Sequence, residues 1–438
     1  MPPSRTARWL PAAAAVAVAA WGANQFTALA TVYRAHTDWS ALSLAAMFSV
    51  YLVGLVPGLL LGGPAADRYG RRRTVRAALG LSAAASVVLA LADEPSVYAA
   101  RLATGFAAGL VFLAGTTWLR ELSGPAVPPE QGARRAMYAT GTGFAAGALA
   151  SGVIAEWLPG PMVLPGLAHA LGCLLVLRAT RGLPETIPAG GTPPCRTAAV
   201  RHPRFRYVVL PASPAVLGAA TVAYVVLPPL VADRVPGYAP LFSGLVAALT
   251  LATGVIAQPF AARLDDADSA RATLTAMATV IAGLLLGALA ADRDSVGLVV
   301  AAAVVLGTGY GLTLGAGLHE VERLTPRSSG PTSASLYQST TSSGFLTPLL
   351  LAGTAGHASY PALLAGMAAV GLLCLAVTAT HSRRHLPGPD HPPAHPDHPT
   401  REDASTESAR IGPTPSRTGP TPLSVGPTPP RSRRPWAE

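Results

Sequence analysis

Two ionisable side chains lie well inside the long apolar runs of this sequence, Arg101 and His169. Removing a charged group from water is costly, so an ionisable residue at such a depth is a functional candidate. Arg101 could pair with a carboxylate or phosphate of a substrate, or it could donate hydrogen bonds to backbone carbonyls of a neighbouring helix. Histidine titrates near neutral pH, so His169 is a candidate for proton coupling, although a helical histidine is often held only by hydrogen bonds to its neighbours.

Neutral polar and aromatic side chains share faces of the same apolar runs. Helical spacing places Asn24 and Gln25 on the face that carries Trp21. Such side chains could line a substrate cavity, or they could serve only as hydrogen bonds between helices. The candidates for the cavity are Trp21, Asn24, Gln25, Arg101, Tyr224, Gln258, Tyr310, Tyr337 and Gln338.

A dense cluster of charge follows the second apolar run, where residues 62–73 read GGPAADRYGRRR. Gly70 permits a tight turn, and Asp67 could meet a helix N-terminus or an arginine. Together with the arginines these residues could form a latch that breaks and re-forms during a conformational change. The simpler alternative, a positively charged loop, requires neither Asp67 nor Gly70.

The composition indicates how these residues are positioned. Half of the 438 residues are apolar, only 12% are charged, and the mean hydropathy is +0.40, which is too little charge for a soluble surface. Twelve runs approach the length of about 20 residues that spans a bilayer. The sequence therefore predicts an all-α integral membrane protein with helices near residues 10–33, 41–63, 75–91, 97–119, 136–158, 162–177, 207–231, 241–262, 272–291, 296–318, 333–355 and 361–380.

The order of these runs predicts two six-helix halves. We expect a first half over residues 1–180, a central cytoplasmic loop over 181–206, a second half over 207–380, and a disordered Pro- and His-rich tail over 381–438. A displacement of about 195 residues lays residues 63–68 over residues 258–263, so the halves read as parallel repeats that could rock about a central cavity.

The distribution of the arginines predicts the orientation. They concentrate on the side that carries both termini, which predicts a multi-pass protein of the bacterial inner (plasma) membrane with cytoplasmic termini. We expect the first run to be retained as a helix rather than cleaved as a signal peptide, because it is long enough to span the bilayer. The net charge of +10 belongs to helix ends and the tail, so we expect no nucleic-acid partner.

The charged segment resembles the signature of the major facilitator superfamily, in its bacterial twelve-helix form. Arg101 to Gly105 is similar to a second family pattern, Arg-x-x-Gln-Gly, with Thr104 in place of glutamine, and residues 183–186 (LPET) are a common ending of the first half. The resemblance implies that Asp67 engages the start of helix 11, and that the arginines engage an acid below helix 4, for which Glu121 is the candidate. The matching positions of the signature are Gly63, Asp67, Arg68, Gly70, Arg71 and Arg72, whereas Ala65 replaces the usual leucine.

The resemblance implies secondary active transport by alternating access. We expect proton-coupled export of a small neutral or anionic organic compound, because the helices offer no carboxylate at mid-membrane depth to hold a cation. The alternatives are proton-coupled uptake of a small solute and a non-transporting membrane sensor or scaffold. We expect no enzymatic activity, cofactor or metal, because no nucleophile with its base, metal cluster or phosphate loop occurs in the apolar runs. The expected partners are a small-molecule substrate, protons and the lipid bilayer, with the chain as a monomer.

Overall fold

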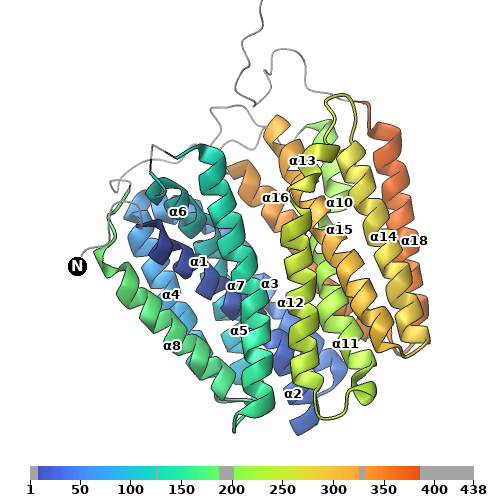
Figure 1. Ribbon diagram of the computed structural model, residues 1–438, viewed down its shortest axis with the longest axis horizontal. Helices are drawn as coiled ribbons and strands as arrows, with labels where there is room; N and C mark the ends of the chain where they lie inside the picture. The colour runs from blue at the N-terminus through green and yellow to red at the C-terminus, as the bar shows by residue number, and fades with distance from the viewer. Residues whose placement is uncertain (1–7, 125–126, 187–201, 325–331, 385–438) are drawn as a thin grey trace, which may run out of the picture. The chain divides into compact units, whose positions relative to one another are not determined.

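The computed structural model describes residues 8–124, 127–186, 202–324 and 332–384. The chain divides into two compact units, Met1–Pro392 and Pro393–Glu438, and the second unit lies outside the described residues together with most of the predicted tail. Much of the predicted central loop, residues 187–201, also lies outside them. All further description concerns the first unit (Figure 1).

The first unit is built of helices that run back and forth along the bundle (Figure 1). The helices up to residue 182 are α1 (Trp9–Asn24), α2 (Phe26–His36), α3 (Ala41–Tyr69), α4 (Arg71–Leu89), α5 (Glu94–Leu110), η2 (Val111–Gly115), α6 (Thr116–Leu122), α7 (Pro129–Trp157), α8 (Leu164–Ala179) and η3 (Thr180–Gly182). The helices from residue 205 onward are η4 (Phe205–Val209), α10 (Leu210–Thr221), η5 (Val222–Val226), α11 (Leu227–Leu230), η6 (Ala232–Arg234), α12 (Ala239–Ala257), α13 (Phe260–Leu264), α14 (Arg271–Asp292), α15 (Val296–Arg323), α16 (Thr332–Ser342), η7 (Ser343–Leu346), α17 (Thr347–Thr354) and α18 (Tyr360–His381).

The described residues form helices and no strand, in agreement with the predicted all-α membrane fold. Joining helical elements that are separated by at most two residues, except α3 and α4 at the Gly70 turn, gives twelve helical runs in this part of the chain. Eight of these runs are long and apolar enough to cross a membrane. The other four are less apolar or shorter: α4 begins with three arginines, α7 is rich in Gly and Thr, α8 has 16 residues, and α16 is rich in Ser and Thr. We call the end of the bundle where α3 meets α4 the motif end, and the opposite end the far end.

Several predicted helix boundaries are wrong. The segment after the second run is not a loop, because α3 continues to Tyr69 and α4 begins at Arg71, which leaves Gly70 as the only residue between them. Helix α7 begins at Pro129 rather than near Ala136. It extends through polar and charged residues that precede the apolar stretch. Pro259 lies in the break between α12 and α13, and η7 interrupts the predicted helix 333–355.

Glycines allow α3 and α5 to approach each other closely. A Cβ atom at Gly105 would overlap the carbonyl oxygen of Tyr51, and one at Gly54 would overlap that of Leu102. Small residues let membrane helices pack backbone against backbone, because no side chain holds them apart. This contact places Arg101 of α5 directly beside α3.

The hydrophobic core differs between the two ends. One large cluster draws residues from both halves, including Phe48 of α3, Tyr224 of η5 and Phe345 of η7, all within about three helical turns of the far end. Three smaller clusters belong to single halves: one around Trp118 in the first, and two around Tyr337 and Ala261 in the second. Side-chain packing in these clusters therefore joins the halves toward the far end.

Candidate functional site

Gly70 makes the turn between α3 and α4 at the motif end. Its backbone has φ +91° and ψ 148°, a combination that side chains other than glycine strongly disfavour. The Glu185 carboxylate lies against this turn and accepts hydrogen bonds from the backbone amides of Arg71 (2.7 Å) and Arg72 (3.1 Å). Glu185 therefore caps the N-terminus of α4, where a negative charge is favoured.

Arg71 joins the Gly70 turn to the end of α6. Its guanidinium Nε donates to the Glu121 carboxylate at 2.8 Å, whereas the Asp67 carboxylate lies 3.9 Å away. Thr186 donates its hydroxyl hydrogen to Glu121, and Arg72 donates to the carbonyl of Leu183. The sequence-predicted residues Asp67, Arg71, Arg72 and Glu121 are thus brought together with the segment 183–186. Arg68 stacks on Tyr69 at the exposed surface, and Gly63 faces Leu113.

Glu185 was not among the residues predicted for the site, although it belongs to the segment LPET that resembles the end of the first half in this family. The signal was present, since an acid directly after the sixth run could reach the arginines at the same end of the bundle. The implied contact of Asp67 with the start of helix 11 falls on residues 325–335, whose side chains lie outside the described part of the chain.

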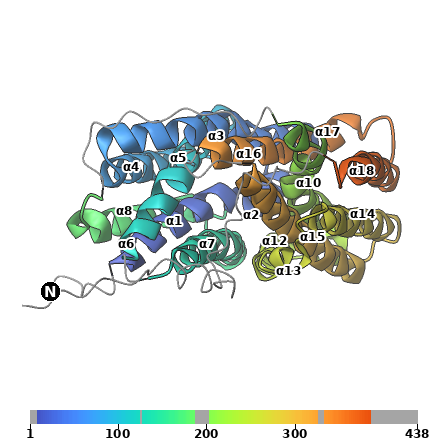
Figure 2. The same cartoon turned by 90° about the horizontal axis from the view of Figure 1, so that it is seen from above.

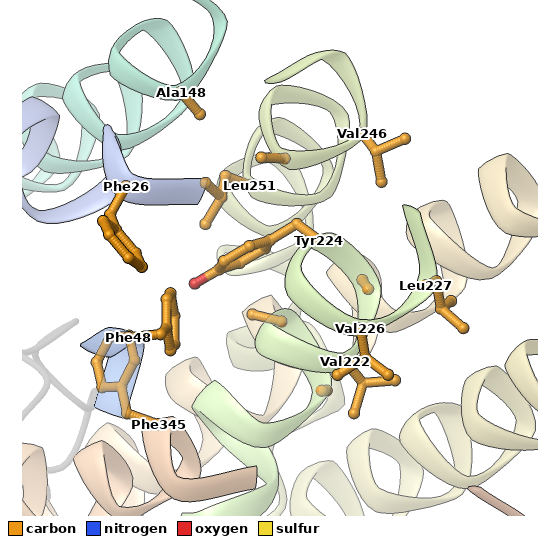
Figure 3. Close-up of a cluster of buried hydrophobic side chains, with 14 of the residues drawn as sticks. Phe26, Phe48, Ala148, Val222, Tyr224, Val226, Leu227, Val246, Leu251 and Phe345 are labelled. Atoms are coloured by element: carbon orange, nitrogen blue, oxygen red, sulfur yellow. The ribbon is translucent and has the colours of Figure 1, made fainter. Parts of the chain in front are cut away.

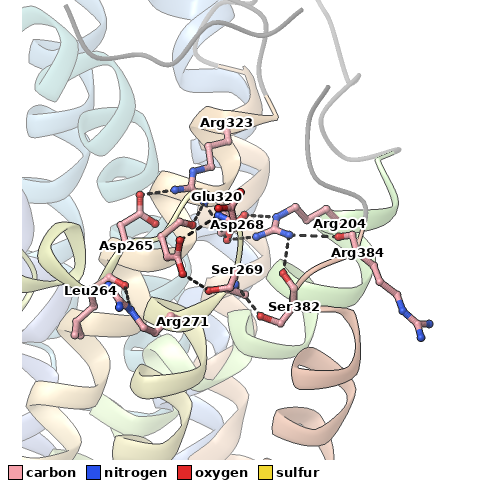
Figure 4. Close-up of polar contacts among 12 residues, drawn as sticks. Arg204, Leu264, Asp265, Asp268, Ser269, Arg271, Glu320, Arg323, Ser382 and Arg384 are labelled. Carbon is pink, nitrogen blue, oxygen red and sulfur yellow. Dashed lines mark hydrogen bonds and ion pairs between the residues drawn. The ribbon is translucent and has the colours of Figure 1, made fainter. Parts of the chain in front are cut away.

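A second ion-pair network braces the other half at the motif end, and the sequence reasoning missed it (Figure 4). Arg204 makes a bidentate pair with Glu320 of α15 at 2.6 and 2.8 Å, and both side chains are almost fully buried. Arg204 also donates to the carbonyl of Ser382 at 3.1 Å, after the end of α18. Arg323 pairs with Asp265 at 2.6 Å, beyond the end of α13.

Arg101 of α5 is 1% exposed and donates hydrogen bonds to three backbone carbonyls. The acceptors are Ala23 of α1 at 3.2 Å and Met47 and Phe48 of α3, each at 3.4 Å. These contacts match the structural role that the sequence left open for Arg101. No ion pair between described residues includes Arg101, so its charge is left without a protein counter-ion in this part of the chain.

Aromatic rings surround the Arg101 guanidinium. Its central carbon lies 4.6 Å from the ring centroid of Tyr51, 4.9 Å from that of Phe26 and 5.7 Å from that of Phe48. The Tyr51 hydroxyl is buried and has no hydrogen-bond partner among the described residues. A buried hydroxyl without a partner is costly, so the Tyr51 hydroxyl is an unused hydrogen-bond donor in the residue whose ring faces the Arg101 guanidinium.

The same rings connect the two halves. Phe345 of η7 packs on Phe48 at 5.6 Å and on Tyr51 at 5.3 Å between ring centroids, and its carbonyl accepts a hydrogen bond from Ser49 at 2.9 Å. Figure 3 shows the Tyr224 hydroxyl directed toward Phe26 and Phe48. On the far-end side, Phe48 also lines a cavity of about 310 Å³ that reaches Arg34, Val225 and Pro348. Phe26, Phe48, Tyr51 and Phe345 were not predicted from the sequence as site residues.

His169 of α8 is completely buried and hydrogen-bonded through both ring nitrogens. Nδ1 lies 2.6 Å from the hydroxyl oxygen of Ser86, and Nε2 lies 2.9 Å from the carbonyl oxygen of Val18. The Trp21 ring meets the imidazole edge-on, with 5.5 Å between centroids. In this arrangement His169 joins α8 to α1 and α4.

The remaining candidates for the cavity are divided among several places. Trp21 donates to Ser151 and Asn24 donates to the carbonyl of Phe144, both on α7, whereas Gln25 donates to Ser86 on α4. Ser86 is also bonded to His169, which the Trp21 ring contacts, so Gln25 and Trp21 lie on either side of one hydrogen-bonded pair. Their role in lining a cavity stays a prediction.

The candidates of the second half lie at different depths. Tyr310 packs against the large cluster that joins the halves, close to Gly254. Tyr337 donates to the carbonyl of Thr313 within a cluster at the motif end, and Gln258 ends α12 near Gly315. The Gln338 backbone carbonyl accepts from Ser342. Among the described candidates of the second half, only Tyr224 contacts a ring beside Arg101, with 6.5 Å between its ring centroid and that of Phe48. No group of three metal-ligating side chains was found among the described residues.

Comparison with known proteins identifies the family. The family model described as Major Facilitator Superfamily matches residues 12–344 and 215–436. A curated relative, the 3-(3-hydroxy-phenyl)propionate transporter of Escherichia coli (strain K12), is 40% identical over 80 residues, which cover 18% of this chain and 20% of that protein. The matched segment thus spans a fifth of the relative's length.

Solved structures show the same fold. The crystal structure of the nucleoside transporter NupG has a TM-score of 0.69 at 13% identity and covers 86% of this chain and 99% of that one. A POT family transporter in complex with 5-aminolevulinic acid has a TM-score of 0.71 at 12% identity and covers 87% and 96% of the two chains. Together, the family match over most of the sequence and the shared fold show that this chain belongs to the Major Facilitator Superfamily of membrane transporters.

Proposed function

We propose that the protein carries a small organic anion across the membrane by alternating access, and that Arg101 binds the anionic group. The observation that carries this proposal is the buried guanidinium of Arg101, which has carbonyl acceptors but no counter-ion among the described residues. A carboxylate entering this site gains a charge-assisted, bidentate partner. A cation would instead meet a fixed like charge in a medium that screens it poorly.

The surroundings of Arg101 favour an aromatic carboxylate. Phe26, Phe48, Tyr51 and Tyr224 offer ring faces, and the Tyr51 hydroxyl offers a hydrogen bond. The relative from Escherichia coli is named for 3-(3-hydroxy-phenyl)propionate, which combines a ring with a carboxylate. Cation–π attraction to these rings, about 0.5–2 kcal/mol, would compensate a cationic substrate only weakly for its lost hydration.

Alternating access is supported by the distribution of contacts between the halves. The rings of Phe48, Tyr51 and Phe345 close the bundle toward the far end, while the motif-end clusters each stay within one half. A rocking motion that separates Phe345 from α3 would connect Arg101 to the cavity at the far end. We propose that the motif end is cytoplasmic, in a plasma membrane, because the arginines gather there.

Proton coupling through His169 and a monomeric state complete the proposal. Both His169 nitrogens are occupied here, so proton exchange requires the other conformation, in which α8 separates from Val18 or Ser86. The same substrate site serves either direction of transport. The expected export is tested by placing labelled acid on either side of a proteoliposome membrane under an imposed proton gradient.

The direct test of the binding site compares 3-phenylpropionate with 3-phenylpropylamine, two molecules of similar size and opposite charge. A ligand that binds only the folded protein raises its melting temperature, and a concentration of 100 times Kd stabilises by about 2.7 kcal/mol. We expect the acid, and not the amine, to raise the melting temperature of the wild type. Arg101→Met should remove this response, Arg101→Lys should keep part of it, and Arg293→Met at the exposed far end should keep all of it. Stabilisation by the amine, or by the acid equally in Arg101→Met, would refute the assignment.

A further inference from the structure

A basic pocket lies at the motif end, between the start of α14 and the end of α18. It has a volume of about 680 Å³ and belongs to the second half alone. Polar side chains and three arginines make up most of its wall: Arg271, Thr275, Thr380, Ser382, Arg383 and Arg384. Neither the transport cycle nor the signature motif uses these residues.

The charge of this pocket is positive. Arg271, Arg383 and Arg384 are exposed, and Figure 4 shows the Arg384 side chain extending away from the buried pair of Arg204 and Glu320. The one carboxylate in the wall, Asp266, already accepts hydrogen bonds from the Ser269 hydroxyl at 2.7 Å and the Asp268 amide at 3.1 Å. These bonds lower the pKa of Asp266, so it stays ionised and offsets one of the three positive charges.

The pocket lies between two helices at the outer edge of the second half. Helices α14 and α18 lie at the edge of the second half (Figures 1 and 2). Both helices carry exposed apolar side chains: Leu373 is 67% exposed, Val370 62% and Leu285 50%. The two apolar residues that line the pocket are Leu274 and Ala379. A ligand here would have its charged part among the arginines and an apolar part along α14 and α18.

We propose that this pocket binds the phosphate headgroup of an anionic phospholipid, with the acyl chains along the outer faces of α14 and α18. Basic pockets between transmembrane helices near the cytoplasmic surface have the chemistry that such headgroups require. Guanidinium groups match phosphate oxygens in geometry as well as in charge. Hydroxyls of Thr275 and Thr380 in the same wall can add hydrogen bonds to the headgroup.

The pocket shares its wall with the buried ion-pair network. The Ser382 hydroxyl accepts a hydrogen bond from the Ala270 amide at 2.8 Å, directly before α14, and the Ser382 carbonyl accepts from Arg204. A headgroup that joins Arg271 to Arg383 would therefore hold α14 and α18 in the arrangement that the Arg204–Glu320 pair requires. Lipid binding should stabilise the folded protein.

The test measures melting temperature of the full chain in detergent, after delipidation, during titration with phosphatidylglycerol, phosphatidylcholine or inorganic phosphate. We expect only phosphatidylglycerol to raise the melting temperature. In Arg271→Gln/Arg383→Gln its apparent affinity should fall roughly 25-fold, from about fivefold per arginine. The matched control is Arg234→Gln/Arg293→Gln, which removes two exposed arginines at the far end and should leave the affinity unchanged.

Three outcomes would overturn the proposal. An equal response to phosphatidylcholine would mean that the headgroup charge is irrelevant. An arginine-dependent response to inorganic phosphate alone, equal to that of the lipid, would identify a site for free phosphate. Equal losses in the two double variants would show that the pocket is not the binding site.

Discussion

The Arg71 guanidinium of α4 donates its Nε hydrogen bond to the Glu121 carboxylate at the end of α6 over 2.8 Å, whereas Asp67 lies 3.9 Å from Arg71. Both of these contacts lie within the first half, and the one with Glu121 is the shorter. Glu185 adds a cap on α4 from the same half. Among the described residues these contacts tie α4 to α6 and to the segment after α8, all in the first half, and rocking of that half as a rigid body would keep them intact.

Reversing the charges of Arg71 and Glu121 tests whether their electrostatic attraction, and not only the burial of their side chains, stabilises the protein. Arg71→Glu alone places three carboxylates together, with Asp67 and Glu121, and we expect it to lower the melting temperature and to abolish transport while leaving membrane insertion intact. Adding Glu121→Arg to this variant should restore part of the melting temperature and part of the transport activity. Membrane fractionation and melting curves of the single and double variants make the measurement, and a double variant no better than Arg71→Glu would count against a direct pair.

The buried pair of Arg204 and Glu320 predicts an asymmetry between single and double substitutions. Glu320→Gln leaves a buried guanidinium without its counter-ion, at a cost of about 3–5 kcal/mol, while Arg204→Met with Glu320→Leu removes both charges and should cost much less. Unfolding followed by denaturant titration in detergent compares the variants. Equal stability of Glu320→Gln and the wild type would show that the pair is solvated.

Gly70, directly before α4, and Gly80, inside α4, provide a matched comparison. Gly70→Ala forces a side chain into a glycine-only backbone conformation and against the Glu185 carboxylate, so we expect a loss of about 1–3 kcal/mol. Gly80 lies in α4 with nothing within 4 Å of an added Cβ, so Gly80→Ala should be neutral or stabilise by about 0.5–1 kcal/mol. Similar melting temperatures for the two variants would argue against the tight turn.

Tyr51 should contribute to substrate affinity through its hydroxyl. Tyr51→Phe keeps the ring against Arg101 and removes only the buried, unpaired donor, so we expect an aromatic acid to bind about fivefold to tenfold more weakly. Tyr33→Phe is the control. Tyr33 also carries a buried hydroxyl without a described partner, but it lies in the last turn of α2, nearer the far end of the bundle. Titration of 3-phenylpropionate by thermal shift measures both affinities, and equal losses would assign the effect to packing.

Local pattern predicted the fold well. Hydropathy located the helical runs, and the signature residues indicated the family before any packing was known. The sequence did not predict that α3 and α4 are separated by Gly70 alone, because arginines and an aspartate at a membrane surface are compatible with either a helix or a loop.

Long-range pairing was the main part that the sequence could not predict. Arg204 and Glu320 are 116 residues apart, and nothing in either local segment marks the other as its partner. The rings around Arg101 come from α2 and α3, and an apolar phenylalanine in an apolar helix carries no signal that it faces a charge. Such contacts depend on how the helices pack, which is set by many small residues at once.

The most direct test of the central claim is transport in proteoliposomes that contain the full chain, with labelled 3-phenylpropionate and 3-phenylpropylamine as paired substrates. We predict that the acid is carried under an imposed proton gradient, that the amine is not, and that Arg101→Met abolishes transport of the acid whereas Arg293→Met does not. Transport of the amine, together with unchanged acid transport in Arg101→Met, would contradict the account and leave Arg101 with only its structural hydrogen bonds to α1 and α3.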